Sequence, residues 1–458
     1  MRKLSYVFLT IIVIAAICLS LPYFMGVLAQ RKCLELTNTF ANLTRAEIKV
    51  VNYQRHWFDA DATFAIRLRP SGFTGINLEK IDAQLQQWTV TAHILHGPVV
   101  IRPSNIKLAQ AVIEAAVIPT KEQNVLLQRE NAVVPLATIL LGINLDGSSS
   151  LNVKGAPLAF KSGQVIFNLQ GLDVQMIFSS FLDKVTSVVN LAGFDFADAN
   201  SALHLQGLKL DYDGTRNALD LWLGQRKVIL QSFTLKRGAD TSLDLSGFSL
   251  NSSITEEKHL ATIRSSIVLD SGNFNGMNYT KNILEWEATN LDMAVFAKLQ
   301  HEIKELGDMN EPSMQQGMNV LKYFGLLLNN GVILTVKQAS SHTPWGTFLA
   351  AGQITSTAAK DANFFALLND LRSEFTLQMQ QPLAQYLLVK YYGQNANSTV
   401  SSDEQAKNLL THWVQSGAIV VDGDSYKTKL KYDKTFFVND KPISLSVNNE
   451  TGLRQKKD

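Results

Sequence analysis

IFNLQGLDV (166–174), LHLQGLKL (203–210) and LDLSGFSL (243–250) are three similar stretches of the chain, and together they decide its predicted fold. Each stretch has two pairs of alternating apolar residues, and a polar residue followed by glycine separates the pairs. The glycines of the three copies are Gly171, Gly207 and Gly247. A weaker fourth copy, WEATNLDM, has Asn290 in the place of glycine. Recurrence at a spacing of about 40 residues indicates repeated supersecondary units that stack on one another.

The side chains that flank each glycine predict an apolar sheet face. Side chains of a strand alternate between its two faces, so a regular strand would put the two apolar pairs of each copy on opposite faces. A one-residue bulge at the polar–glycine step restores a common face, and glycine tolerates the backbone angles that a bulge requires. The candidate apolar face then consists of Leu169, Leu172, Leu205, Leu208, Leu245 and Phe248.

Bulges at one height in several strands would curl the sheet into a trough, because each bulge bends its strand and increases the local twist. Two interpretations of this trough are open. In the first, helices or a second sheet close the apolar face into an ordinary core, as every amphipathic sheet must hide that face. In the second, the face forms an open groove that accepts a ligand.

The whole chain predicts an α+β, β-rich fold, with an N-terminal transmembrane helix followed by large curled, mostly antiparallel sheets and a few helices. Helical spacing of apolar residues predicts helices over 174–192, 291–306, 313–328, 364–375 and 404–416. Ser402-Asp403-Glu404-Gln405 is expected to cap the last of these. The predicted domains are an anchor over 1–30, an antiparallel β domain with bulged repeats over 31–290, and an α+β region over 291–458.

The amino-terminal segment predicts a membrane anchor. No charged residue lies between Lys3 and Arg31, and the run from Tyr6 to Leu21 is almost entirely apolar. About 20 such residues cross a bilayer as a helix. Arg2 and Lys3 before the run favour a cytoplasmic amino terminus and an exported body. The alternative is a cleaved signal peptide, with small residues for cleavage at Val27-Leu28-Ala29.

Composition excludes several classes of protein. The 458 residues carry 42 Lys and Arg against 40 Asp and Glu, a formal net charge of +2, whereas a nucleic-acid surface needs concentrated positive charge. Apolar residues make up 46% of the chain, which is enough for a sizeable core. Cys18 and Cys33 are the two cysteines, too few for a disulfide framework or a cysteine-rich zinc site.

Motifs of catalytic chemistry are incomplete in this sequence. His301-Glu302 begins like a zinc-protease helix motif, but Glu305 stands where the second histidine ligand belongs. Ser104 and Lys107 match a Ser-x-x-Lys motif whose companion motifs are missing. We therefore predict a protein that is not an enzyme, with no catalytic residue, no cofactor and no metal ion. An enzyme with a site dispersed along the chain is the alternative.

The order of these features resembles the YdgA-type family of Gram-negative envelope proteins, whose function is unknown. The local features that carry the resemblance are Tyr53, Phe58, His96, Gly97, Pro98 and the closing segment YDKTFFVNDKPI. The sequence departs from the family at His56, where glycine is usual. The resemblance implies an inner-membrane anchor with a periplasmic body, and it carries over no catalytic residue. A looser, architectural resemblance links the chain to AsmA-like proteins, which hold lipid tails in curled sheets.

These observations lead to two hypotheses about function. The first is a non-enzymatic envelope protein, held in the bacterial inner membrane by residues 1–30, whose apolar sheet face binds lipid or another amphiphile. The second is a structural scaffold for envelope partner proteins, with the sheet face closed into a core. Neither hypothesis involves nucleic acid.

Overall fold

The computed structural model describes two compact units of the chain. The described residues are 21–31, 33–35, 37, 46–68, 87–102, 105–127, 134–238, 241–274, 276–308, 314–328, 331–356, 371–394 and 401–443. Unit 1 takes the described residues within 1–217, 224–248 and 274–276, and unit 2 takes those within 218–223, 249–273 and 277–458.

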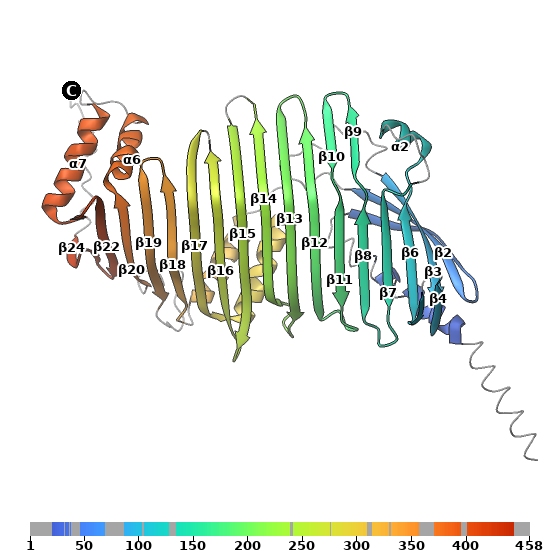
Figure 1. The fold of residues 1–458 in the computed structure, drawn as a ribbon. Coiled ribbons are helices and arrows are strands. Elements are labelled where there is room, and N and C mark those ends of the chain that lie inside the picture. Colours follow the sequence, from blue (N-terminus) through green and yellow to red (C-terminus); the bar gives the residue numbers. More distant parts are fainter. Residues whose placement is uncertain are drawn as a thin grey trace, which may run out of the picture. The chain divides into compact units, whose positions relative to one another are not determined.

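Unit 1 is built on one antiparallel sheet. Its strands are β1 (Ala46–Arg55), β2 (Asp59–Leu68), β3 (Gln87–His96), β6 (Ala111–Val117), β7 (Ala137–Ile143), β8 (Ser149–Gly155), β11 (Leu172–Phe178), β12 (Lys184–Ala197) and β13 (Ser201–Arg216). They pair in this order, and each pair is antiparallel (Figure 1). The β-rich, antiparallel prediction is therefore confirmed.

Shorter elements complete unit 1. They are β4 (Val99–Arg102), β5 (Asn105–Leu108), α2 (Lys121–Leu126), β9 (Leu158–Ser162) and β10 (Val165–Leu169). β4 and β5 form a separate hairpin, whereas β9 pairs with β10 and β10 pairs with the second half of β12. β14 (Trp222–Arg237), β15 (Thr241–Glu257) and β16 (Leu260–Phe274) have residues in both units.

Alternation along each strand gives the sheet of unit 1 one apolar face. In β3, for example, Val90, Ala92 and Ile94 are buried while the intervening side chains are exposed. This is the period of two that a strand with one solvated face requires.

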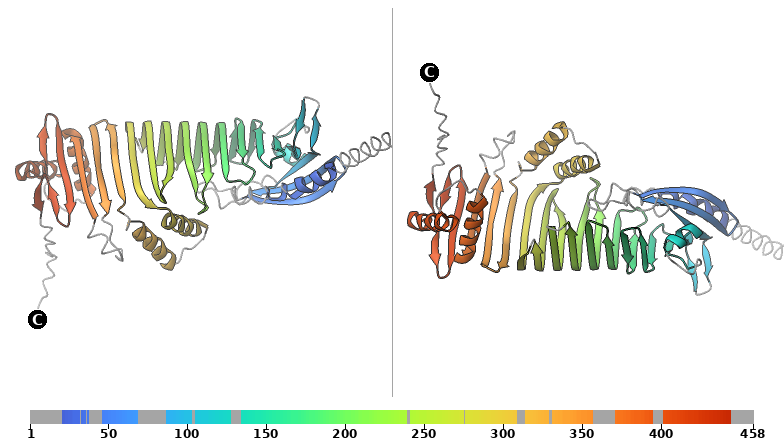
Figure 2. Two further views of the ribbon diagram at one scale, coloured as in Figure 1. Left: turned by 90° about the horizontal axis from the view of Figure 1, so that it is seen from below. Right: turned by 90° about the horizontal axis from the view of Figure 1, so that it is seen from above.

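A helical segment covers part of this apolar face. We call residues 21–31, 33–35 and 37 the inner helix, and Figure 2 shows it lying along β1 and β2. Ala29 and Cys33 of this helix belong to the same buried cluster as Phe64, Ile94 and other residues of the sheet. The inner helix therefore closes the core at this end of unit 1.

In its described residues, unit 2 combines antiparallel strands with four helices. Its elements, apart from the strands that it shares with unit 1, are β17 (Met277–Asp292), α3 (Met293–Asp308), α4 (Met314–Leu328), β18 (Ile333–Thr343), β19 (Gly346–Ser356), β20 (Leu371–Gln380), α6 (Gln381–Gln394), α7 (Ser402–Ser416), β21 (Val420–Asp422), β22 (Ser425–Asp433), β23 (Phe436–Val438) and β24 (Lys441–Ile443). Met293 and Leu327 help to form its core, where α3 and α4 pack beside β17.

The structure corrects two of the predicted helices. Residues 174–192 form the end of β11, a turn and most of β12, because Val174 and Val189 pair with each other across a β-ladder. Residues 371–375 of the predicted helix 364–375 belong to β20, and the rest lie outside the described residues. The helices predicted over 291–306, 313–328 and 404–416 are confirmed as α3, α4 and α7.

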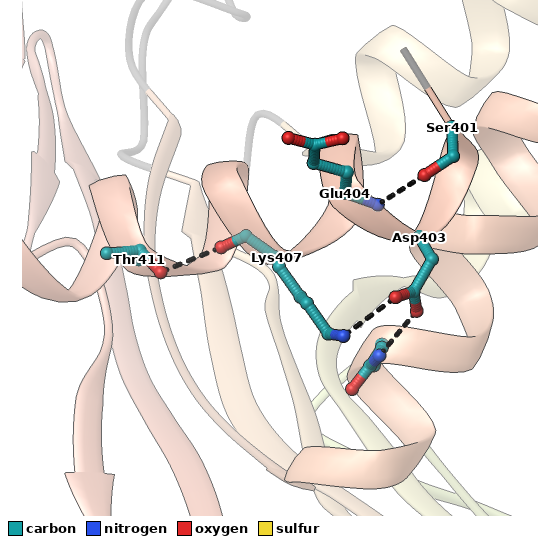
Figure 3. Close-up of polar contacts among 6 residues, drawn as sticks. Ser401, Asp403, Glu404, Lys407 and Thr411 are labelled. Carbon is teal, nitrogen blue, oxygen red and sulfur yellow. Dashed lines mark hydrogen bonds and ion pairs between the residues drawn. The ribbon is translucent and has the colours of Figure 1, made fainter.

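α7 begins at Ser402, the residue predicted to cap it, so the N-cap lies one residue earlier than predicted. Ser401, rather than Ser402, is the N-cap, and its hydroxyl accepts a hydrogen bond from the backbone N–H of Glu404 (Figure 3). Asp403 forms an ion pair with Lys407 at 2.7 Å, one helical turn along.

In the part of the chain that the structure describes, no helix is both long and apolar enough to cross a membrane. Residues 1–20 of the predicted anchor lie outside that part, and residues 21–30 belong to the inner helix.

Candidate functional site

The glycine steps of the repeats have the backbone conformation that favours glycine. The φ angle is 132° at Gly171, 64° at Gly207 and 66° at Gly247. Asn290, in the weaker fourth copy, has a φ of 62°. L-residues with side chains rarely adopt this region, and asparagine does so more readily than most. The four copies therefore share one backbone feature, as their sequences indicated.

The step differs from the predicted one-residue bulge. Leu172, Leu191 and Leu208 are cross-strand partners on one side of the step, and Leu169 and Phe194 are partners on the other side. β12 keeps the same register with its neighbours before and after the step, so no strand has an extra residue relative to the next. β10 and β11, β12 and β13 therefore make the step at the same height and stay in register with one another.

Glutamine side chains explain two glycines at this height. A Cβ added to Gly193 would lie 2.6 Å from the side chain of Gln170, and one added to Gly207 would lie 2.8 Å from the Cβ of Gln231. Both distances are too short for non-bonded carbon atoms. Gln231 lies in β14, at the parity shift that its sequence shows without glycine. The sequence did not single out Gly193, because its neighbours do not match the repeat.

The predicted apolar side chains lie in rows across the sheet. The rows are Leu169–Phe194–Leu205, Leu172–Leu191–Leu208 and Val174–Val189–Leu210. All nine side chains are partly exposed, whereas Val90, Ile94 and Leu141 on the same face are buried. We call these three rows the trough. Leu245 and Phe248 of the prediction lie in β15 and are also partly exposed.

The opposite face of unit 1 carries a polar hollow of ≈ 880 Å³. Asp61, His93, Glu114, Leu140, Asn152 and Gln175 form one cross-strand row along its floor. A second hollow of ≈ 500 Å³ lies at the glycine step of Gly171 and Gly207, and its lining includes Leu172, Leu191 and Leu208 of the trough as well as Lys154 of the polar hollow. Sequence reasoning missed the polar hollow, because its residues come from seven strands and share no local motif.

Two pairs of side chains in the polar hollow lie within ion-pair distance. His93 Nδ1 lies 3.0 Å from Asp61 Oδ1, and Arg102 Nε lies 2.6 Å from Glu114 Oε1. In the described chain, no group of three His, Cys, Asp or Glu side chains is placed to hold a metal ion. The arrangement suits the binding of a polar surface by hydrogen bonds.

His96, Gly97 and Pro98 are held by close packing and backbone hydrogen bonds. His96 is only 4% exposed, and its ring packs against Gly26 of the inner helix. A Cβ added to Gly97 would lie 1.5 Å from the carbonyl oxygen of Ala109, so only glycine fits there. Pro98 accepts a hydrogen bond from the backbone N–H of Ala109, at 3.0 Å. This tripeptide joins β3 to the β4–β5 hairpin.

Tyr53 and Phe58 lie apart from the trough. Tyr53 packs against the buried cluster of unit 1, and burial raises the pKa of its phenol to about 12. Its hydroxyl has no hydrogen-bond partner among the residues that the structure describes. Phe58 lies in the turn between β1 and β2 and is 57% exposed.

The fold and these two faces define a class of antiparallel β-sheet proteins with an apolar trough on one face and a polar hollow on the other. The family model described as "Bacterial protein of unknown function (DUF945)" matches residues 1–446. The chain therefore belongs to this bacterial family. Neither the curated proteins nor the solved structures contain a match to it.

Proposed function

We propose that this protein is a non-enzymatic component of the bacterial envelope, anchored in the inner membrane, whose trough binds the acyl chain of a lipid or another amphiphile. The trough carries the proposal. Nine apolar side chains in three rows are partly exposed, although the same face is buried elsewhere in unit 1. Covering such side chains with an acyl chain is favourable by about 25 cal/mol per Å² of apolar surface removed from water.

The inner helix supports a retained anchor over a cleaved signal peptide. Ala29, the last residue of the candidate cleavage site, is fully buried in the core of unit 1. Gly26 lies against the ring of His96. Cleavage after Ala29 would remove both contacts, so the amino-terminal segment and the body belong together. With the amino terminus in the cytoplasm, the body then lies in the periplasm.

Photo-crosslinking at neighbouring positions of β13 tests the binding of lipid. Leu208 points into the trough, and Lys209, the next residue, points to the opposite face. p-Benzoylphenylalanine would be placed at each position in the full chain, and adducts formed in cells would be identified by mass spectrometry. We expect lipid adducts at position 208 and none at 209. Equal lipid labelling at both positions, or none at 208, would contradict the proposal.

A scaffold for envelope proteins is the second candidate. The polar hollow favours it, since polar and paired charged groups line a concave face of ≈ 880 Å³ that the core does not need. The same crosslinker at Asn152, on the floor of the hollow, tests this function. Specific protein adducts at Asn152, without lipid adducts at 208, would favour the scaffold.

A further inference from the structure

Four exposed aromatic rings come from the first described residues of the inner helix and from the β1–β2 turn; ring contacts join three of them, and Phe58 directly follows Trp57 in the chain. They are Tyr23, Phe24, Trp57 and Phe58, which are 39%, 63%, 50% and 57% exposed. Tyr23 and Phe24 lie among the first described residues of the inner helix, and Trp57 and Phe58 lie in the β1–β2 turn. Two segments that are 32 residues or more apart in the sequence thus contribute to one surface, which we call the aromatic collar.

Direct contacts hold the two halves of the collar together. The rings of Tyr23 and Trp57 are 5.6 Å apart, and those of Tyr23 and Phe24 are 6.1 Å apart. The guanidinium of Arg55 lies 4.6 Å from the centre of the Tyr23 ring, and its Nη2 donates a hydrogen bond to the Tyr23 hydroxyl oxygen at 3.0 Å. These rings are therefore exposed on a defined surface that Arg55 helps to fix.

The collar lies directly after the apolar run of the sequence. That run, Tyr6 to Leu21, ends two residues before Tyr23. At 1.5 Å per residue, two residues of helix span about 3 Å. The interfacial layer on each side of a bilayer's hydrocarbon core is thicker than this, at roughly 5–7 Å. If the run lies in a bilayer, Tyr23 and the rings beside it fall at the height of the lipid headgroups.

We propose that the aromatic collar is a membrane-docking surface that inserts into the headgroup layer of the phospholipid bilayer holding the apolar run. Tyrosine and tryptophan concentrate at this depth in membrane proteins, because their rings have an apolar body and a polar tip. The guanidinium of Arg55 has the geometry to bind a lipid phosphate. The proposal rests on the proposed membrane anchoring, and it adds that the body of unit 1 itself touches the bilayer.

Paramagnetic broadening of ¹⁹F signals tests the collar. The full chain would be reconstituted in phosphatidylethanolamine–phosphatidylglycerol nanodiscs, with trifluoromethylphenylalanine at position 24, 58 or 125 in separate samples. Val125 on α2 provides the control, since it is 78% exposed and lies outside the collar. Doxyl-labelled lipid would be added to each sample. We expect loss of the signals at positions 24 and 58, while the signal at 125 persists.

The outcomes separate the collar from the anchor. Co-elution of the chain with the nanodiscs reports anchoring independently of the ¹⁹F signals. If the chain co-elutes but the signals at 24 and 58 are broadened no more than that at 125, the collar is overturned and the anchor stands. If the chain does not co-elute with the nanodiscs, both proposals fail. A Trp57→Ser variant gives a further check: the signal at Phe58 should be broadened less, with co-elution unchanged.

Discussion

The residue type at position 97 is restricted to glycine by the backbone of Ala109, twelve residues further along the chain. The carbonyl oxygen of Ala109 occupies the place where a side chain at position 97 would begin. Since the backbone there is also hydrogen-bonded, with the N–H of Gly97 donating to the Gln110 carbonyl at 2.7 Å, the chain has little freedom to move away.

Gly97→Ala is therefore expected to destabilise unit 1 strongly, by about 3 kcal/mol or more. Urea denaturation of the full chain would measure the change. Gly163→Ala is the control, since a Cβ there meets nothing within 4 Å and the φ of 58° alone opposes it. That control should lose only about 1–2 kcal/mol. Equal losses in the two variants would show that the Ala109 contact is not decisive.

His96 makes the stability of unit 1 depend on pH. Burial lowers the pKa of its imidazole below the ordinary value of 6.5, although the backbone of Trp57 and the carboxylate of Asp59 oppose this shift. A base with a lowered pKa takes up its proton more readily in the unfolded chain. Its contribution to stability is thus intact above pH 6.5 and is lost as the pH falls below it.

His96→Phe should remove this loss, because an aromatic ring is kept at the site and no proton can bind to it. Between pH 7 and 5, the free energy of unfolding of the wild type should fall by up to about 1.4 kcal/mol per pH unit more than that of the variant. Chemical denaturation over a pH series would measure this difference. An exposed histidine, His412, provides the control variant His412→Phe. Identical pH profiles of the wild type and His96→Phe would contradict the prediction.

At the scale of single residues, the sequence predicts the backbone conformation of a residue better than it predicts the residues that it contacts. The unusual backbone at Gly171, Gly207 and Asn290 follows from a local parity shift, which the letters display. The fit of Gln170 over Gly193 does not, because it depends on which strand becomes the neighbour. The contact between Gly97 and Ala109 is likewise not predictable, because the sequence around each residue does not show that they will be neighbours.

The N-cap of α7 is an element whose stability depends on one side chain. Ser401→Ala removes the hydroxyl that satisfies the Glu404 N–H, and we expect a loss of about 1 kcal/mol. Thermal unfolding of the full chain, followed by the far-UV circular dichroism, would measure it. Ser402→Ala, one residue later, keeps the cap and should change the stability by only a few tenths of a kcal/mol. A larger loss of stability in Ser402→Ala than in Ser401→Ala would show that Ser401 is not the N-cap.

Elements with strict alternation or long helical spacing were predictable, and ambiguous apolar runs were not. Ile177, Phe181 and Val185 have the spacing of a helix, yet they lie in β11, in the turn that follows it and in β12 respectively. The turn passes through Leu182, whose φ of 56° gives no signal in the sequence. Long-range pairing with β8 and β13 decides the outcome, and a local window contains neither partner.

At the scale of the whole molecule, the described chain has separate buried clusters in its two units. Ile94 is fully buried in unit 1 and Met293 is fully buried in unit 2. Truncating either to alanine should remove about 2–5 kcal/mol from the unit that contains it.

Hydrogen exchange with mass spectrometry would show where each truncation acts. Ile94→Ala should speed exchange in β2, β3 and β6, and Met293→Ala should speed it in α3 and β17. Each variant serves as the control for the other. If both raise exchange equally throughout the chain, the two clusters do not stabilise separate units.

The largest gap in the sequence prediction concerns how the core of unit 1 is closed. Residues 21–30 read as part of a membrane anchor, because they carry no charge. The structure uses them as the inner helix of a protein core, and an apolar helix satisfies both environments equally. The hydrophobicity of this segment predicts that it is buried, but it does not distinguish burial in lipid from burial in protein.

The place of Cys33 on the inner helix has a chemical consequence. Its thiol is buried, and loss of hydration raises its pKa to about 11. Only the thiolate attacks alkylating reagents, and at pH 8 roughly one molecule in a thousand would carry it. Iodoacetamide should therefore not alkylate Cys33 while the inner helix is packed on the sheet. The rate at which Cys33 is alkylated therefore reports how often the inner helix detaches from the sheet.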